Sequence, residues 1–368
     1  MVRRASPVTA YRIVHCADVH LETTFPETRG GSGRRKALAD AFTRIVDAAL
    51  ARNADALTIG GDLYENERAG PQTARFLFEQ FARFGRPVYV APGNHDPYGP
   101  ASLLARGDVP ENVKIFNEAA WRPYPLADGV TLYGFGHTPA EPGRPFARAA
   151  FARGGVQLAL VHGSDEERCP PNKRATAPFT TDEALAAGAT LVLTGHYHGG
   201  YVTHREKQPV VAYPGSPEPI KFGENDVHGA LEITIEGSAV VARALPTART
   251  RLVELACDLA GAASEQQVFA CIEPLVAPYG ANDFVRVRLR GSVLDGTRVD
   301  AALLEERLGA SLGSLEILDG TVAHDYAAIA SEPTVRGHVV RDLLGRGDAG
   351  LPALRYALAA FDGAEIAP

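Results

Sequence analysis

Side chains that bind divalent metal ions recur through the first 200 residues of the chain. They stand in five short motifs, each directly behind an apolar run: Asp18-Val19-His20, Gly60-Gly61-Asp62, Gly93-Asn94-His95-Asp96, His162-Gly163 and Gly195-His196-Tyr197-His198. Because the carboxyl ends of neighbouring strands meet at one edge of a sheet, we expect the motifs to converge. One such motif alone arises by chance or forms an ordinary turn. Five in chain order predict a metal site.

The spacing within the motifs suits two metal ions. In the Asp-x-His and His-x-His pairs, donors two residues apart lie on the same side of an extended chain. Gly60 and Gly61 carry no side chain, so the carboxylate of Asp62 can approach closely and bridge two ions. Imidazole, carboxylate and amide donors together suit Mn, Fe or Zn better than Ca or Mg. Two such ions, roughly 3.5–4 Å apart, favour in-line displacement at a phosphoryl group.

Alternating strands and helices are predicted to hold these motifs. Strand-like runs precede them at residues 12–16, 56–59, 88–90, 156–161 and 191–193, and helical patterns lie at 34–52 and after Pro71. Further strand-like runs follow at residues 130–135, 210–213, 231–235 and 240–244. So many strands with few later helices predict two packed sheets flanked by helices, a four-layer α/β/β/α sandwich.

The residue pattern of the sequence changes near residues 246–250, which indicates a domain boundary. We expect a first domain over residues 1–248, a smaller α/β capping domain over 249–330 and a helical tail over 331–368. In the second domain, residues 283–290 alternate strictly, with Val285, Val287 and Leu289 on one face and Arg286, Arg288 and Arg290 on the other. The arginine face is either solvated or holds DNA. The tail predicts two short amphipathic helices around residues 339–344 and 354–361.

Composition, net charge and cysteine spacing limit the classes of protein to which this chain can belong. The 368 residues are 45% hydrophobic and 22% charged, as in ordinary globular proteins. The net charge of −7 gives no global support for nucleic-acid binding, although a local patch such as the glycine-rich loop over residues 29–36 could contact phosphates. Four cysteines without CxxC spacing exclude a zinc ribbon. No apolar run reaches the length of a membrane helix or signal peptide, so we expect a cytoplasmic protein.

Taken in order, the five motifs resemble the calcineurin-like metallophosphoesterase superfamily. Three segments further resemble its SbcD-type DNA repair exonucleases, including their YhaO-like branch: residues 15–22, His196-Tyr197-His198, and residues 213–217 followed by Phe222-Gly223-Glu224. The resemblance covers residues 10–245 firmly, residues 250–330 loosely and the tail hardly at all.

The resemblance implies a division of roles among the motif residues. One metal would be held by Asp18, His20, Asp62 and His198, and the other by Asp62, Asn94, His162 and His196. His95 would contact the scissile phosphate and protonate the leaving oxygen, with Asp96 orienting its imidazole. Both ions are expected to be Mn²⁺. Archaeal and eukaryotic relatives carry a histidine where Glu65 stands, which leaves the balance of endo- and exonuclease action open, and His137 could line the cleft.

The expected function is therefore Mn-dependent hydrolysis of DNA phosphodiesters in repair. The resemblance implies DNA, an SMC-like ATPase of the SbcC type and a second copy of the chain as partners. The tail helices either grip the ATPase or pack back onto the chain's own capping domain. One alternative is a metal-dependent phosphatase or small-molecule phosphodiesterase, against which the capping domain argues. The other is a weakly catalytic scaffold for DNA ends or the ATPase, against which the intact ligand set and His95 argue.

Overall fold

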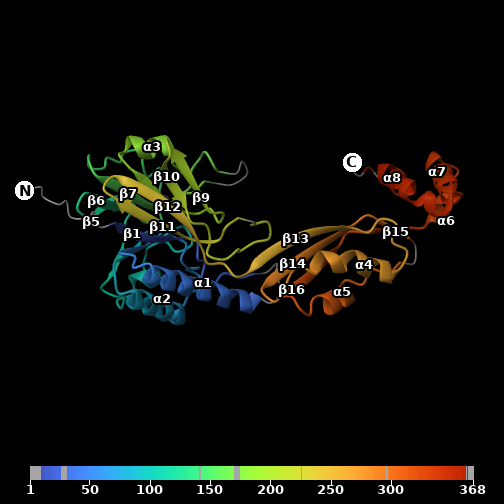
Figure 1. The fold of residues 1–368 in the computed structure, drawn as a ribbon, viewed down its shortest axis with the longest axis horizontal. Coiled ribbons are helices and arrows are strands. Elements are labelled where there is room, and N and C mark those ends of the chain that lie inside the picture. The colour runs from blue at the N-terminus through green and yellow to red at the C-terminus, as the bar shows by residue number, and fades with distance from the viewer. Residues whose placement is uncertain are drawn as a thin grey trace, which may run out of the picture. The chain divides into compact units, whose positions relative to one another are not determined.

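The computed structural model describes residues 10–25, 31–140, 142–169, 175–224, 226–294, 297–361 and 363. They form two compact units, the first ending at Thr250 and the second running from Arg251 (Figure 1). No helix among these residues is long and apolar enough to cross a membrane.

Two six-stranded sheets make up the first unit. One has the order β12-β11-β1-β2-β3-β4, with bounds Ala239–Pro246, Gly229–Glu236, Tyr11–Cys16, Ala56–Ile59, Val88–Val90 and Val113–Ile115. The other has the order β5-β6-β7-β8-β10-β9, with bounds Arg122–Ala127, Val130–Gly134, Val156–His162, Leu191–Gly195, Gln208–Tyr213 and Tyr201–Arg205. The central strands of both sheets pair in parallel, while β11, β12, β5 and β9 pair antiparallel with their neighbours.

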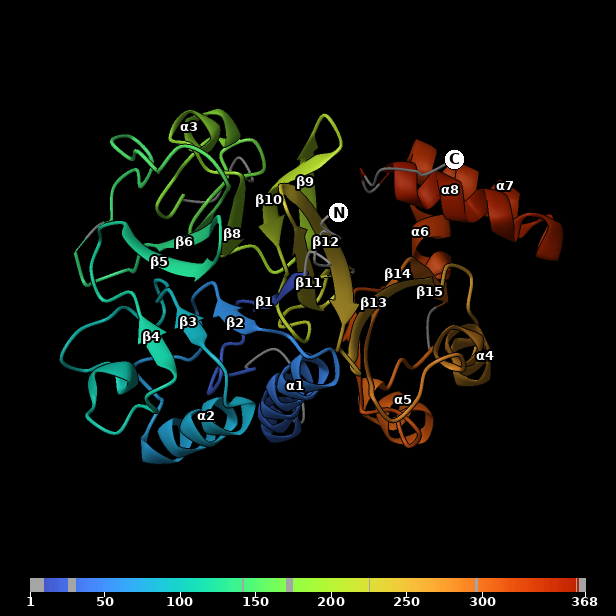
Figure 2. The ribbon, with the colours of Figure 1, turned by 60° about the vertical axis from the view of Figure 1, so that its left-hand side comes forward.

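Helices cover the outer faces of these sheets. Helices α1 (Gly31–Ala51) and α2 (Pro71–Phe84) lie along one side and α3 (Thr181–Ala186) on the opposite side, with both sheets between them (Figure 2). In β1, Ile13 packs between the sheets while Val14 packs under the helices, so this central strand is apolar on both faces. The predicted arrangement of two sheets flanked by helices is confirmed.

The glycine-rich segment differs from its prediction as a loop. Residues from Gly31 onward form the start of α1. Arg34 is fully buried, stacks on Phe25 with its guanidinium carbon 5.1 Å from the ring centre, and donates a hydrogen bond to the carbonyl of Pro219. It is therefore unavailable for a phosphate contact. The rest of the predicted segment, residues 29 and 30, lies outside the described residues.

The second unit contains a three-stranded parallel sheet of β13 (Arg251–Asp258), β14 (Asp283–Arg290) and β16 (Ser314–Asp319), with α4 (Glu265–Val276) and α5 (Ala301–Leu308). Strands β15 (Ser292–Leu294) and β17 (Val322–His324) form a separate pair. The predicted inward face is confirmed, since Val285, Val287 and Leu289 lie in the core, but the alternation is not strict, because Arg286 on the other face is also buried.

The opposite face of β14 is not a free cationic surface. The register places Glu254 and Glu316 on either side of Arg286, whose side chain pairs with both at 3.6 and 2.6 Å. Arg288 pairs with Glu254 at 2.9 Å. Because neighbouring carboxylates neutralise these two arginines, nothing in this sheet favours their predicted contact with DNA.

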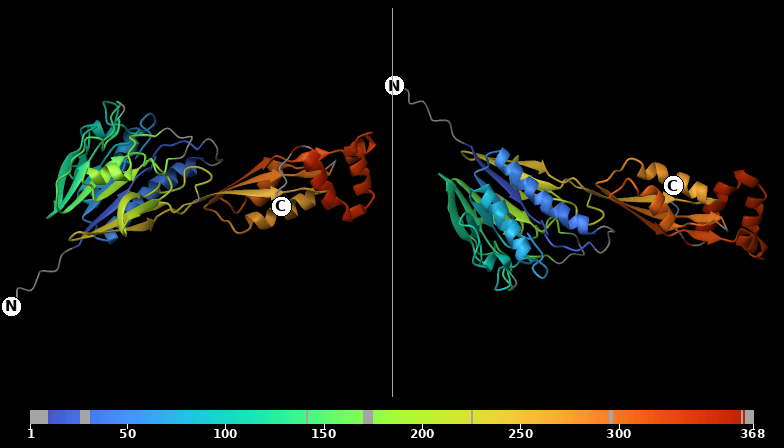
Figure 3. Two further views of the ribbon diagram at one scale, coloured as in Figure 1. Left: turned by 90° about the horizontal axis from the view of Figure 1, so that it is seen from above. Right: turned by 90° about the horizontal axis from the view of Figure 1, so that it is seen from below.

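Helices α6 (Tyr326–Ser331), α7 (Val335–Leu344) and α8 (Leu351–Phe361) gather at one end of the second unit (Figure 3). The two amphipathic helices predicted for the tail correspond to α7 and α8. Val340, Leu354 and Leu358 are buried in a small cluster shared with α6. A domain boundary at residue 330 stays a prediction.

Candidate metal centre

The five motifs follow β1, β2, β3, β7 and β8, which are parallel strands of the two sheets. The loops after β1 and β2 are joined by backbone bonds, from Asp18 N to Gly61 O at 3.0 Å and from His20 N to Asp62 O at 2.9 Å. Two strands from distant parts of the chain thereby present their polar side chains together.

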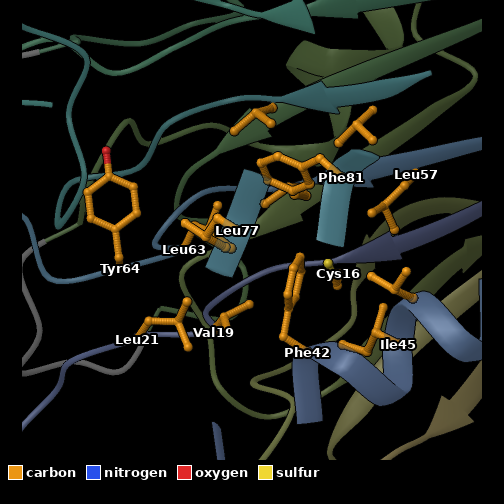
Figure 4. Packing of buried hydrophobic residues seen from close by; sticks show 14 of the residues in the cluster. Cys16, Val19, Leu21, Phe42, Ile45, Leu57, Leu63, Tyr64, Leu77 and Phe81 are labelled. Atoms are coloured by element: carbon orange, nitrogen blue, oxygen red, sulfur yellow. The ribbon is translucent and has the colours of Figure 1, made fainter. Parts of the chain in front are cut away.

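Apolar residues that alternate with the polar ones anchor these loops. Val19, Leu21, Leu63 and Tyr64 belong to the core cluster that includes residues of α1 and α2, and Figure 4 shows Val19 next to Phe42 and Leu63 next to Leu77. The intervening side chains are consequently directed away from that core. Buried Asp18, His20 and Asp62 also have positive φ angles of 53°, 49° and 52°. Such strained backbone concentrates at functional sites, where the surrounding packing maintains it.

Six of the seven predicted ligands fall into two groups whose ligand atoms lie within 4.8 Å of one another. One group is Asp18, His20 and His198, and the other is Asp62, His162 and His196. Asp62 stands between them, because its Oδ2 lies 3.2 Å from His162 Nε2 and 3.7 Å from His20 Nε2. The seventh predicted ligand, Asn94, joins the second group through its Oδ1, 3.0 Å from His162 Nε2.

Three of the four imidazoles are oriented through Nδ1. His20 donates to Glu65 Oε1, His198 to Glu224 Oε1 and His162 to the carbonyl of Gly60, each at 2.8 Å. A carboxylate or carbonyl oxygen only accepts, so the proton must lie on Nδ1, which leaves Nε2 as the nitrogen that binds a metal.

The site suits divalent cations. Among the described residues, His20 Nε2 is buried without a hydrogen-bond partner, which is costly unless an ion is bound there. Burial opposes a positive charge on His162, yet Asp62 raises the pKa of this imidazole to about 9. The negative charge that attracts a proton also attracts a cation. The mixed nitrogen and oxygen donors therefore fit two transition-metal ions that share Asp62.

His95 lies beside this group without belonging to either ligand set. Its backbone N–H donates to Asp62 Oδ1 at 2.8 Å, and its Nδ1 donates to Glu65 Oε2 at 2.8 Å. The hydrogen bond to Glu65 raises the pKa of His95 to about 9. With 44% of its side chain exposed, this protonated imidazole can reach a bound substrate.

Asp96 differs from the sequence-based expectation, and Glu65 makes the contact with His95 that was expected of Asp96. Asp96 does not contact the imidazole of His95. Its buried carboxylate accepts backbone N–H groups of Asp62, Leu63 and Gly93 at 3.1, 2.8 and 2.6 Å, so it shapes the loop that carries Asp62. The imidazole is oriented instead by Glu65, which also holds His20.

Sequence reasoning left the role of Glu65 open and expected that His137 could line the cleft. The signal for Glu65 was its place three residues after Asp62, on the loop that faces the first motif. His137 is buried, and its Nε2 lies 2.7 Å from the carbonyl oxygen of His162. It therefore supports the second ligand group through the backbone of His162. Burial lowers the pKa of His137 to about 4, which keeps it neutral.

Comparisons with known proteins agree with this arrangement. The calcineurin-like phosphoesterase family model matches residues 11–200. The uncharacterized metallophosphoesterase YhaO of Bacillus subtilis is 28% identical over 230 residues, covering 57% of this chain and 54% of YhaO. The DNA double-strand break repair protein Mre11 of Methanopyrus kandleri is 26% identical over 242 residues, covering 60% of this chain and 51% of that protein. Mre11 of Haloferax volcanii is 26% identical over 353 residues, which cover 89% of this chain and 73% of that protein.

The chain thus spans about half the length of the first two relatives. The resemblance to this family and to its YhaO-like members, predicted from the motifs, is confirmed.

The close approach of two loops at Gly93 can be tested by substitution. A Cβ at this position would lie 2.3 Å from Asp62 Oδ1, so Gly93→Ala must displace the carboxylate between the two ligand groups. We expect the variant to fold and to lose bound Mn²⁺, as measured by elemental analysis of dialysed protein. Gly107→Ala, whose Cβ would meet nothing within 4 Å, is the control and should keep its metal. Equal metal content in both variants would contradict this account.

Proposed function

The chain belongs to the calcineurin-like phosphoesterase family, and we propose that it is a two-metal phosphodiesterase that hydrolyses DNA, with Mn²⁺ as its metal. The observation that carries the proposal is the position of Asp62 between two groups of ligand atoms, with His95 bonded beside it. A bridged pair of cations and a proton donor for the leaving oxygen together favour hydrolysis of a phosphodiester, and this arrangement offers ligands for the cations and a candidate donor.

In the proposed site, Asp18, His20, Asp62 and His198 hold one ion, and Asp62, Asn94, His162 and His196 hold the other. Two divalent ions supply the activation of water and the neutralisation of phosphoryl charge that diester hydrolysis requires. The protein fixes the direction of the ligand nitrogens, through Glu65, Glu224 and the carbonyl of Gly60. The ligand geometry is therefore set before substrate binds.

The proposed role of His95 is to protonate the leaving oxygen. Its hydrogen bond to Glu65 leaves Nε2 to face a substrate and keeps the imidazolium charged at neutral pH. An alkoxide is a poor leaving group, so a positioned proton donor lowers the barrier of the step. Asp96 contributes indirectly, by holding the backbone at Asp62 and Gly93.

DNA is the proposed substrate because the repair proteins named Mre11 share this domain at 26% identity. A phosphatase would need the same metal centre. The metal ligands therefore do not distinguish a phosphatase from a DNA phosphodiesterase, and a test of substrates does. The scaffold alternative is disfavoured by the orientation of His95, since a binding surface has no need of a positioned proton donor.

The metals and the proton donor can be separated by two substitutions. Asp62→Ala should lose both metal content and activity, because the carboxylate serves both groups. His95→Ala should keep two ions and lose about 10²–10⁴-fold in turnover, the usual contribution of a general acid. His338→Ala, on the exposed side of α7, is the control. Metal loss from His95→Ala as large as that from Asp62→Ala would reject these roles.

Substrate class is tested by salt dependence. Contacts with the DNA backbone release counterions, so KM for duplex or single-stranded DNA should rise steeply between about 50 and 200 mM salt. The Asp62→Ala protein, prepared in parallel, excludes a contaminating nuclease. Faster hydrolysis of a small phosphomonoester, with no dependence on salt, would favour the phosphatase.

We further propose that α7 and α8 bind an SMC-like ATPase of the SbcC type. Val335, Tyr356 and Phe361 are 74%, 46% and 44% exposed on these helices, and they are the apolar side chains that such an interface would use. Leu358 of α8 is fully buried, so removal of the tail would also remove part of a core.

Point variants separate docking from folding. The double variant Tyr356→Ser/Phe361→Ser should keep its melting temperature and DNA cleavage and lose binding to the ATPase in a pull-down. Leu358→Ala should instead destabilise the helical cluster by about 2–5 kcal/mol, because it leaves a cavity. A double variant that still binds the ATPase would remove α8 from the interface.

A further inference from the structure

Residues 216–224 and 226–228, which we name the strap, lie between β10 and β11 and contact the proposed metal ligand His198 twice. The backbone N–H of Ser216 donates to the carbonyl of His198 at 2.9 Å. Glu224 Oε1 accepts from His198 Nδ1 at 2.8 Å, while Glu224 Oε2 accepts from the backbone of Ile220 and Lys221 at 2.7 and 3.2 Å. Both the backbone and the ring of His198 are thus held by the strap.

The other contacts of the strap hold the last four residues of the first unit, Thr247 to Thr250, which we name the linker. Glu218 accepts the backbone N–H groups of Arg249 and Thr250, both at 3.0 Å. The carbonyl of His228 accepts from the backbone of Thr247 at 3.1 Å. The chain continues from the linker into β13 of the second unit.

A buried charge pair makes these contacts rigid. The side chain of Glu218 is fully buried and pairs with Arg44 of α1 at 2.5 Å, and Arg44 also donates to the carbonyl of Thr247 at 2.8 Å. At the other end of the strap, His228 Nδ1 lies 3.0 Å from the hydroxyl of Ser216. Moving the linker would leave the Glu218 carboxylate buried with fewer donors, which is costly. The strap therefore moves with the linker.

We propose that the strap couples the linker to the metal centre, so that holding the linker in place raises the affinity of the His198 site for its ion and displacing the linker lowers it. This inference rests on the proposed function in one respect, that His198 binds metal. Any partner or substrate that displaces the linker would then regulate the centre. Coupling between two sites is reciprocal, so metal binding must also stabilise the linker.

Hydrogen exchange of the unaltered protein tests this reciprocity. Saturating Mn²⁺, compared with EDTA, should slow exchange of the Arg249 and Thr250 amides by about fivefold or more, the lower end of ordinary coupling. Amides in α3, remote from the strap contacts, provide the internal control. Unchanged exchange at the linker while Mn²⁺ binds would overturn the proposal.

The effect of the linker on metal affinity is tested by Glu218→Gln, which keeps the size of the side chain and removes its charge. Mn²⁺ affinity, measured by electron paramagnetic resonance, should fall by about fivefold or more. Thr180→Ala, which removes the cap of α3, is the matched destabilised control and should keep its affinity. Unaltered protein that binds no Mn²⁺ would overturn the proposed function, whereas normal affinity in Glu218→Gln would overturn the coupling alone. If Glu218→Gln fails to fold, the exchange experiment decides.

Discussion

The first unit is organised around the carboxylate of Asp62, which is only 2% exposed. A buried charge without compensation costs on the order of several kcal/mol, so its surroundings must supply donors or cations. His95 donates a backbone N–H to one oxygen, while His162 and His20 face the other. The absence of a side chain at Gly93 lets the two loops close on this carboxylate. The ligand groups lie on either side of it, so both sheets contribute imidazoles to the surroundings of one charge.

Carboxylates beside the candidate metal ligands position those ligands. Glu65 and Glu224 each accept a hydrogen bond from Nδ1 of an imidazole and so direct Nε2 toward the metal centre. Asp96 accepts only backbone N–H groups and shapes a loop instead. Residues of one chemical type thus serve different purposes because their neighbours differ. Glu65 links the metal-binding side of the site to its proton donor, since it contacts both His20 and His95.

The two units use charge differently. In the first unit, carboxylates and imidazoles collect at one place and leave a buried nitrogen of His20 without a hydrogen-bond partner among the described residues, as a cation site requires. In the second unit, Arg286 and Arg288 are matched by glutamates across the strands, so their charge serves the sheet. Val335, Tyr356 and Phe361 on α7 and α8 are large apolar side chains that this unit exposes, which is why we propose protein binding rather than DNA binding for its helices.

Much of this protein follows from local sequence. Apolar runs that end in Asp18, Asp62, Asn94, His162 and His196 were enough to predict strands, converging carboxyl ends and a metal site, because side-chain period is a local property. The alternation in residues 283–290 likewise predicted one buried face. The roles of Asp96 and Glu65, the burial of Arg34 and the attachment of the linker by Glu218 depended on tertiary structure. Each of these side chains has a partner, such as Pro219 for Arg34 or Thr250 for Glu218, that is tens or hundreds of residues away along the chain or is a backbone group. No local pattern specifies such a partner, because a carboxylate or guanidinium bonds to whatever donor or acceptor the fold brings within reach.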